Sequence, residues 1–88
     1  MDTQQRMDEM RLRLETKLDP VDLELLDEGH LHVGHAGAKD GRGHFRLRIV
    51  SPKFVGKTMM QRHRLVYQAM GDLMKTDIHA LTIEAEDP

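Results

Sequence analysis

Histidine gives this chain most of its potential chemistry, because 88 residues contain six histidines and no cysteine. Four of them, His30, His32, His35 and His44, lie in or beside a glycine-rich stretch, and His79 begins a later apolar segment. Neutral imidazole is a common metal ligand, and a glycine-rich backbone can bring such ligands together at little conformational cost. One interpretation of the pattern is therefore a metal or metal-cluster site built from loop histidines and His79.

The spacing alone favours a simpler interpretation of the same histidines, as polar residues of a loop and ordinary residues of strand ends. His-x-His and His-x-x-His in a loop are weak signals, and no His-Glu-x-x-His motif accompanies them. His79 has the alternation parity of Leu81 and Ile83, which equally fits a partly buried core residue. His44 is expected on the outer face of a strand, where a structural hydrogen-bonding role is favoured over a role as a metal ligand. His63 lies on an apolar stripe, which favours a packing role.

The composition argues for a binding protein and against an enzyme. Without cysteine there is no disulfide framework, no thiol nucleophile and no self-sufficient Cys-ligated zinc or iron–sulfur site. Ser51 is the only serine and precedes a proline. Asp27 and Glu28 are adjacent, and neighbours in a strand point to opposite faces. We expect one domain over residues 1–88. The polar N-terminus and the absence of a long apolar stretch predict a cytoplasmic protein that does not enter a membrane.

Hydrophobic periodicity predicts the elements that must position these residues. Residues 3–18 are expected to form an amphipathic helix that ends at Asp19-Pro20. Residues 28–43 are expected to form a long loop. Alternating segments predict strands over 21–25, 45–49 and 80–86. The residues expected to face the core are Val21, Leu23, Leu25, Phe45, Leu47, Ile49, Leu81, Ile83 and Ala85.

A second helix is expected over roughly Thr58 to Met74, although two short helices joined near Gly56 would fit the same segment. Its expected apolar stripe comprises Met59, His63, Val66, Met70 and Leu73, widened by Met60, Tyr67 and Met74.

Two topology rules then place the histidines. The first two strands are neighbours in sequence and most simply pair antiparallel. The second and third strands flank a helix, and such a crossover joins parallel strands with a right-handed connection. The end of the first strand and the starts of the other two therefore meet at one end of the sheet. This topology gathers the glycine-rich loop, His44 and His79 there.

A basic segment forms a second candidate surface. Residues 41–71 contain seven basic and no acidic residues, although the whole chain has a formal net charge of −2. Lys53, Lys57, Arg62 and Arg64 surround the start of the second helix, with the two arginines expected to point to solvent. Such a cluster suits phosphate, nucleic acid or an acidic partner. It is equally open that these basic residues form an ordinary solvent-exposed face, balanced by the acidic termini. No aromatic residues alternate with them to stack on bases, which argues against nucleic-acid binding.

Several short blocks occur in a characteristic order: LLDE (25–28), HVGHAG (32–37), GHFR (43–46), FVGK (54–57), QRHRLVY (61–67) and IHAL (78–81). Together they resemble the BolA family, in its histidine-loop subgroup, over nearly the whole chain. The resemblance implies an α+β fold of order helix-strand-strand-helix-helix-strand. It implies a three-stranded mixed sheet with helices on one face, similar to the type II KH fold.

The resemblance also implies a partner and a cofactor. Members of this family share a [2Fe–2S] cluster with a monothiol glutaredoxin and its glutathione, and no cluster is expected on the isolated chain. The protein would be a monomer alone or a heterodimer with the glutaredoxin. His79 would be one ligand, and a loop histidine the other. His32 fits the register best and His35 next, but Gly29 and Arg42 depart from the usual loop pattern, so the loop ligand stays open.

A second implied function is transcriptional regulation through DNA. The family is described as binding DNA through the basic helical region, which here corresponds to Lys53, Lys57, Arg62 and Arg64. The two functions can coexist, because the loop and the basic helix can occupy different surfaces. A third alternative is a scaffold that binds a protein partner and no metal.

Overall fold

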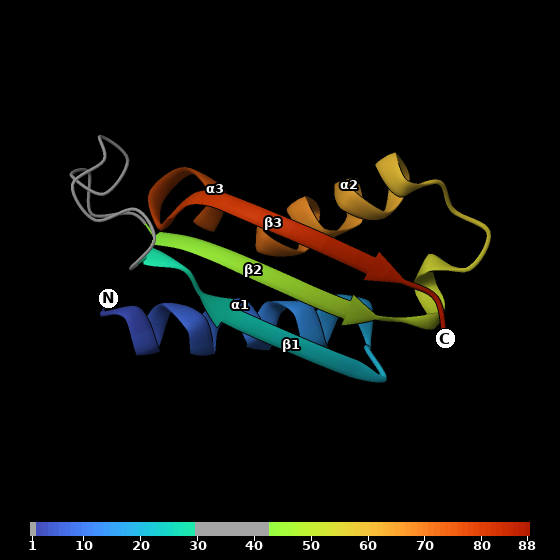
Figure 1. Ribbon diagram of the computed structural model, residues 1–88, viewed down its shortest axis with the longest axis horizontal. Coiled ribbons are helices and arrows are strands. Elements are labelled where there is room, and N and C mark those ends of the chain that lie inside the picture. The colour runs from blue at the N-terminus through green and yellow to red at the C-terminus, as the bar shows by residue number, and fades with distance from the viewer. Residues whose placement is uncertain (1, 30–42) are drawn as a thin grey trace.

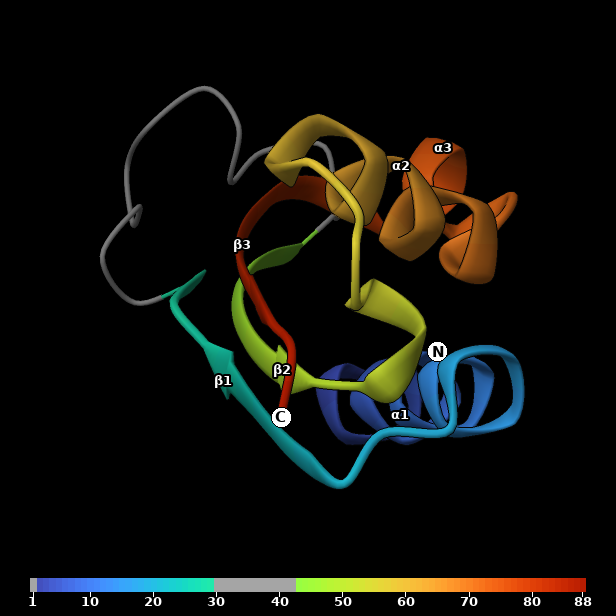
Figure 2. The same ribbon diagram turned by 90° about the vertical axis from the view of Figure 1, so that its right-hand side faces the viewer.

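The computed structural model describes residues 2–29 and 43–88. A three-stranded mixed sheet lies on one side, and the helices pack against one of its faces (Figures 1 and 2). This architecture confirms the predicted α+β fold and element order. The elements are α1 (Thr3–Leu18), β1 (Asp22–Asp27), β2 (Gly43–Val50), the 3-10 turn η3 (Pro52–Phe54), α2 (Met59–Met70), α3 (Leu73–Thr76) and β3 (Ile78–Glu86).

Helix α1 begins and ends where its sequence predicts. Asp2 and Gln5 form a capping box, in which the Gln5 N–H donates to Asp2 Oδ1 (2.8 Å) and the Asp2 N–H donates to Gln5 Oε1 (2.9 Å). The helix ends at Asp19, which adopts a left-handed conformation with φ 45° and donates its N–H to the Glu15 carbonyl. Pro20 cannot continue the helix. The face of α1 toward the sheet buries Met10, Leu14 and Leu18.

The sheet confirms both predicted pairings. Strands β1 and β2 are antiparallel, with Asp27 opposite Phe45, and β2 and β3 are parallel, with Leu47 opposite Ile83. The end of β1 and the starts of β2 and β3 therefore lie at one end of the sheet, which we call the histidine end. The opposite end holds the end of β2 and η3 (Figure 1).

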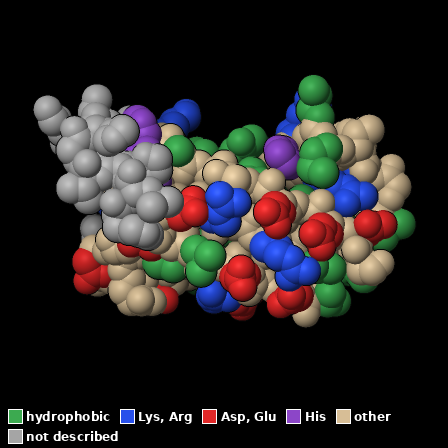
Figure 3. Space-filling view, in the orientation of Figure 1, with side chains coloured by type: hydrophobic (Ala, Val, Ile, Leu, Met, Phe, Trp, Pro, Cys, Tyr) green, Lys and Arg blue, Asp and Glu red, His purple; other side chains and the backbone are tan. Residues whose placement is uncertain are grey.

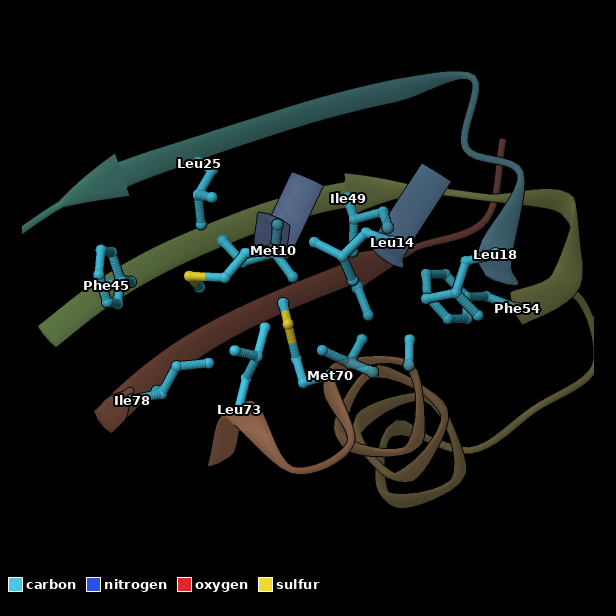
Figure 4. Packing of buried hydrophobic residues seen from close by; sticks show 14 residues of the cluster. Met10, Leu14, Leu18, Leu25, Phe45, Ile49, Phe54, Met70, Leu73 and Ile78 are labelled. Carbon is cyan, nitrogen blue, oxygen red and sulfur yellow. The ribbon is translucent and has the colours of Figure 1, made fainter. Parts of the chain in front are cut away.

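One hydrophobic cluster fills the space between the helices and the sheet (Figure 4). Its most deeply buried members include Met10, Leu14, Phe45, Leu47, Ile49, Phe54, Val66, Met70 and Ile78. The predicted inward face of β2 is correct, but Val21 is 67 % exposed. Because β1 begins one residue later, the alternation of the strand does not reach Val21, which lies in the connection from α1.

The second helical segment differs from its prediction in two ways. It breaks at Gly71, whose φ of 59° ends α2, and α3 follows; the break is not at Gly56. The face toward the core consists of Val66, Ala69, Met70 and Leu73, so Val66, Met70 and Leu73 of the predicted stripe are confirmed and Ala69 is an addition. Three residues of the predicted stripe are instead exposed, namely Met59, Met60 and Tyr67. The prediction thus fails at the first turn of α2 and at the widened edge of the stripe, where apolar residues lie outside the face that contacts the core.

None of the helices in the described part of the chain is both long and apolar enough to span a membrane.

Candidate functional site

A β-bulge at the histidine end determines where His79 points. Gly43 of β2 lies opposite Ile78, but the next residue, His44, lies opposite Ala80, so His79 is an extra residue on β3. The bulge shifts the alternation of the strand by one position. Ile78 is consequently buried in the core, and His79 is exposed. The expectation that His79 shares the inward face of Leu81 is therefore wrong, because simple alternation does not hold across a bulge.

His44 lies directly beside His79. The two ring centroids are 4.8 Å apart, and the ring planes are inclined by 44°. His44 is on the central strand and only 8 % exposed, and its carbonyl accepts the Glu28 N–H at 2.8 Å. His44 thus occupies the outer face of the sheet as predicted, although it is buried there. The predicted meeting of the starts of β2 and β3 brings these two imidazoles together.

Gly43 makes room for this arrangement. A Cβ atom at Gly43 would lie 2.4 Å from Cε2 of Phe45, whose ring is fully buried. No real Cβ makes so short a contact, so a side chain here would require the ring or the strand to move. The Gly43 N–H also donates to the Asp77 carbonyl at 2.9 Å, which ties β2 to the residue preceding β3.

Asp77 connects the start of β3 to helix α1. Its carboxylate accepts hydrogen bonds from the Thr76 hydroxyl and from Arg6 Nε, the latter at 3.2 Å. The Thr76 hydrogen bond, and then the contact with Arg6, hold the pKa of Asp77 below its usual range. The backbone two residues before His79 is thus attached to a helix on the other side of the core.

The predicted loop ligands lie outside the described residues. His32 and His35 belong to residues 30–42, as does His30, so the prediction that they are metal ligands stays a prediction. The described chain stops at Gly29 and resumes at Gly43, and both residues are at the histidine end. Among the described residues, no three His, Cys, Asp or Glu side chains form a group able to hold a metal ion.

The outer face of the sheet carries paired charges. Arg46 contacts Glu28 at 3.0 Å and Glu84 at 3.7 Å. Arg48 contacts Asp22 at 2.8 Å and also Glu86. Acidic and basic side chains alternate over this face (Figure 3). Because these arginines already have carboxylate partners, the face offers little net charge to another molecule.

Arg62 is a structural residue and not part of an open basic surface. Its side chain is 16 % exposed. Nε donates to the Lys57 carbonyl at 3.0 Å, and Nη1 donates to the Ala85 carbonyl at 3.1 Å. Asp87 lies 3.6 Å from Nη1. The prediction that Arg62 points to solvent is wrong, because it lies on the same helix face as Val66 and reaches the end of β3.

The other three basic residues of the predicted surface are exposed. Lys53 follows Pro52 in η3, Lys57 precedes the capping residue of α2, and Arg64 lies on the second turn of α2. None of the three pairs with a carboxylate within residues 2–29 and 43–88. Long, exposed cations without internal partners are available to an anionic molecule. The basic surface therefore consists of Lys53, Lys57 and Arg64.

A shallow apolar hollow of about 400 Å³ lies beside this basic surface. Its lining is Met59, Met60, His63, Arg64 and Tyr67. The sequence prediction assigned most of these residues to the core. Met59 and Met60 form the first turn of α2, next to the capping residue Thr58, and both are exposed. His63 is half-buried, and none of the described residues hydrogen-bonds its Nε2.

Comparisons with known proteins agree with this fold. The family model for BolA-like proteins matches residues 14–88. SufE-like protein 1, chloroplastic/mitochondrial, of Arabidopsis thaliana is 46% identical over 84 residues, which are 90% of this chain and 23% of that protein. Protein BOLA1, chloroplastic, of the same plant is 41% identical over 94% of this chain and 54% of its own length. The DNA-binding transcriptional regulator BolA of Escherichia coli is 36% identical over 84% of this chain and 71% of its own length.

Solved structures give the same result. The BolA domain of SufE1 from Arabidopsis thaliana superimposes with a TM-score of 0.83 at 43% identity, covering 100% of this chain and 95% of that one. The solution structure of BolA1 from Mus musculus superimposes with a TM-score of 0.78 at 38% identity, covering 94% of this chain and 65% of that one. The chain thus spans about a quarter to a half of the first curated relatives that it matches.

Proposed function

This chain belongs to the BolA-like protein family, and we propose from that premise that it is a binding protein that shares a [2Fe–2S] cluster with a monothiol glutaredoxin. It would act as an adaptor in iron–sulfur trafficking or iron regulation, and not as an enzyme. His79 would supply an imidazole ligand, and His32 or His35 a second one. Glutaredoxin and glutathione would supply thiolates.

The observation that carries this proposal is the exposure of His79 at the histidine end. The bulge at Gly43 and His44 turns the imidazole out of the core, toward the sheet end where the described chain meets residues 30–42. An exposed imidazole fits a cluster ligand that must reach a second protein, whereas a buried imidazole would not. Mixed thiolate and imidazole ligation generally raises the reduction potential of such a cluster above that of all-thiolate ligation.

The test is a titration of a cluster-loaded monothiol glutaredoxin with this protein, followed by visible absorption and circular dichroism. We expect a saturable spectral change that is complete at a one-to-one ratio, because imidazole replaces ligands on one side of the cluster. A spectrum that stays unchanged in excess of this protein would overturn the proposal.

DNA binding is a second candidate function, favoured by the basic surface of Lys53, Lys57 and Arg64. These cations are exposed and have no carboxylate partner among the described residues, and one relative is named a DNA-binding transcriptional regulator. A phosphate backbone would pair with such cations in a salt-dependent manner. Helix α2 alone offers few further backbone donors, because Thr58 and Gln61 cap its start.

Arg64→Ala is the informative variant for DNA binding, since Arg62→Ala would also break the contacts of Arg62 with β3. We expect Arg64→Ala to weaken duplex binding and to lower the slope of affinity against salt by about one. Fluorescence anisotropy of a labelled duplex at several salt concentrations measures the affinity and its salt dependence. The matched control is Arg11→Ala, on the exposed face of α1. Binding that ignores salt, or that weakens equally in the control, would contradict this function.

Neither the histidine end nor the basic surface indicates where in the cell the protein is found. A cytoplasmic location stays a prediction, since two of the relatives are named as chloroplastic or as chloroplastic/mitochondrial proteins.

A further inference from the structure

We propose that His44 is a positioning residue that holds the imidazole of His79 through ring contact. This inference rests on the proposed function of His79 as a ligand, and it assigns a task to a histidine that the ligand set does not use. His44 would not bind the cluster itself. Its ring would restrict the rotation of the His79 side chain before a partner arrives.

The position of His79 explains why such support is needed. His79 lies on an edge strand and is the extra residue of a bulge, so it does not face a residue of β2 in the regular ladder. When an exposed side chain binds, it loses rotamer freedom, and that loss costs conformational entropy. A ligand held in place beforehand avoids part of this cost.

The position of His44 explains why it can give that support. It lies on the central strand, is almost fully buried, and its carbonyl is tied to the Glu28 N–H. Its backbone is therefore fixed from both sides of the sheet. The N–H of the preceding residue, Gly43, donates to the Asp77 carbonyl, and the Phe45 ring leaves no room for a side chain at Gly43. His44 consequently offers a rigid ring surface at a set place.

The contact itself is a ring contact. A centroid separation of 4.8 Å lies within the range of about 4.5–7 Å in which aromatic rings attract one another, and the 44° inclination lies between stacked and edge-to-face arrangements. In this proposal the flat ring of His44, and not its nitrogen atoms, supports His79. Three substitutions therefore distinguish a role of the His44 ring from a role of its polar nitrogen atoms.

The test compares His44→Ala, His44→Phe and His44→Gln. The first removes the ring, the second keeps a ring without nitrogen, and the third keeps polarity without a ring. Thr82→Ala, which is exposed on the same strand as His79, is the control. Thermal unfolding of each variant checks that it folds.

The first readout needs no cluster. NMR relaxation of the His79 ring in the isolated protein measures its mobility on the picosecond-to-nanosecond timescale. We expect the ring to become more mobile in His44→Ala and His44→Gln, and to stay as ordered as in the wild type in His44→Phe and Thr82→Ala.

The second readout is the titration of cluster-loaded glutaredoxin. Loss of an outer support typically weakens metal binding by at least about 10-fold, so we expect the midpoint for His44→Ala and His44→Gln to shift by about that factor. His44→Phe should restore most of the loss. The final spectrum should be that of the wild type in all variants, because the ligands are unchanged.

Three results would overturn the proposal. One is a His79 ring that is equally mobile in the wild type and in His44→Ala. Another is rescue by His44→Gln and not by His44→Phe, which would make the nitrogen atoms responsible. The third is an altered final spectrum in His44→Phe, which would make His44 a ligand.

Failure of the proposed function can be distinguished from failure of this inference. If His79 is not a ligand, His79→Ala leaves the titration unchanged, while the mobility of the His79 ring still decides the role of His44.

Discussion

At the scale of single residues, Arg13 joins helix α1 to the end of α2 and to the turn at Gly71. Its Nη1 donates to the Met70 carbonyl at 2.7 Å and to Asp72 Oδ1 at 2.8 Å, and its Nε donates to Glu9. The hydrogen bond from Arg13 lowers the pKa of Asp72. Helix α1 is thereby attached to the end of α2 through the Met70 carbonyl, and to the following turn through an ion pair that depends on the ionised Asp72 carboxylate.

This contact predicts a pH-dependent contribution to stability. A carboxyl group with a lowered pKa in the folded state stabilises the protein above its unfolded pKa, and that contribution is lost as the pH falls through the folded pKa. We expect Asp72→Asn to lower the urea midpoint near neutral pH. The difference from the wild type should shrink as the pH falls from about 6 to about 3, below the ordinary aspartate pKa. Urea unfolding at several pH values measures it, and a constant difference would contradict the assignment.

The histidines show what can be predicted about residues from this sequence. Strand order and pairing were sufficient to bring His44 and His79 to the same end of the sheet. The direction of His79 was not predictable, because it depends on a bulge opposite Gly43, and Gly43 is one of several glycines in that stretch. The positions of His32 and His35 relative to His79 stay predictions.

At the scale of elements, the bulge between β2 and β3 depends on the absence of a side chain at Gly43. The clash of a Cβ with the buried Phe45 ring predicts that Gly43→Ala destabilises the protein by about 1–3 kcal/mol, the usual cost of overpacking a core. Chemical denaturation measures the loss.

A double-mutant cycle isolates the cause of that loss. Phe45→Leu removes the ring atoms that the new Cβ would meet, so Gly43→Ala should cost less in that background than in the wild type. An equal cost in both backgrounds would show that the ring is not responsible, and that Gly43 is needed for its backbone alone.

The boundaries of the helices were predictable where the signal is local. Asp2 and Asp19-Pro20 fix α1 through capping and through the restriction that a proline imposes, and these need no tertiary information. The end of α2 at Gly71 and its buried face depend on packing against α1 and the sheet. Val66, Met70 and Leu73 were predicted to be buried, whereas the burial of Ala69 and the exposure of Met59, Met60 and Tyr67 depend on the fold.

At the scale of the whole molecule, the two candidate surfaces lie at opposite ends. The histidine end holds the starts of β2 and β3, whereas the chain that carries Lys53 and Lys57 follows the end of β2 (Figure 1). The sheet between them carries arginines paired with carboxylates. A glutaredoxin at the histidine end would therefore leave the basic surface free for another partner, so the two proposed functions need not compete.

The central claim is that His79 supplies a ligand to a shared cluster, and one comparison tests it most directly. A cluster-loaded monothiol glutaredoxin is titrated with the wild type, with His79→Ala and with Thr82→Ala, and the visible circular dichroism is recorded. We expect the same one-to-one spectral change for the wild type and Thr82→Ala. His79→Ala should fold normally, since the side chain is exposed, and should lose that change. If His79→Ala folds and still gives the wild-type spectrum, His79 is not a ligand of the cluster.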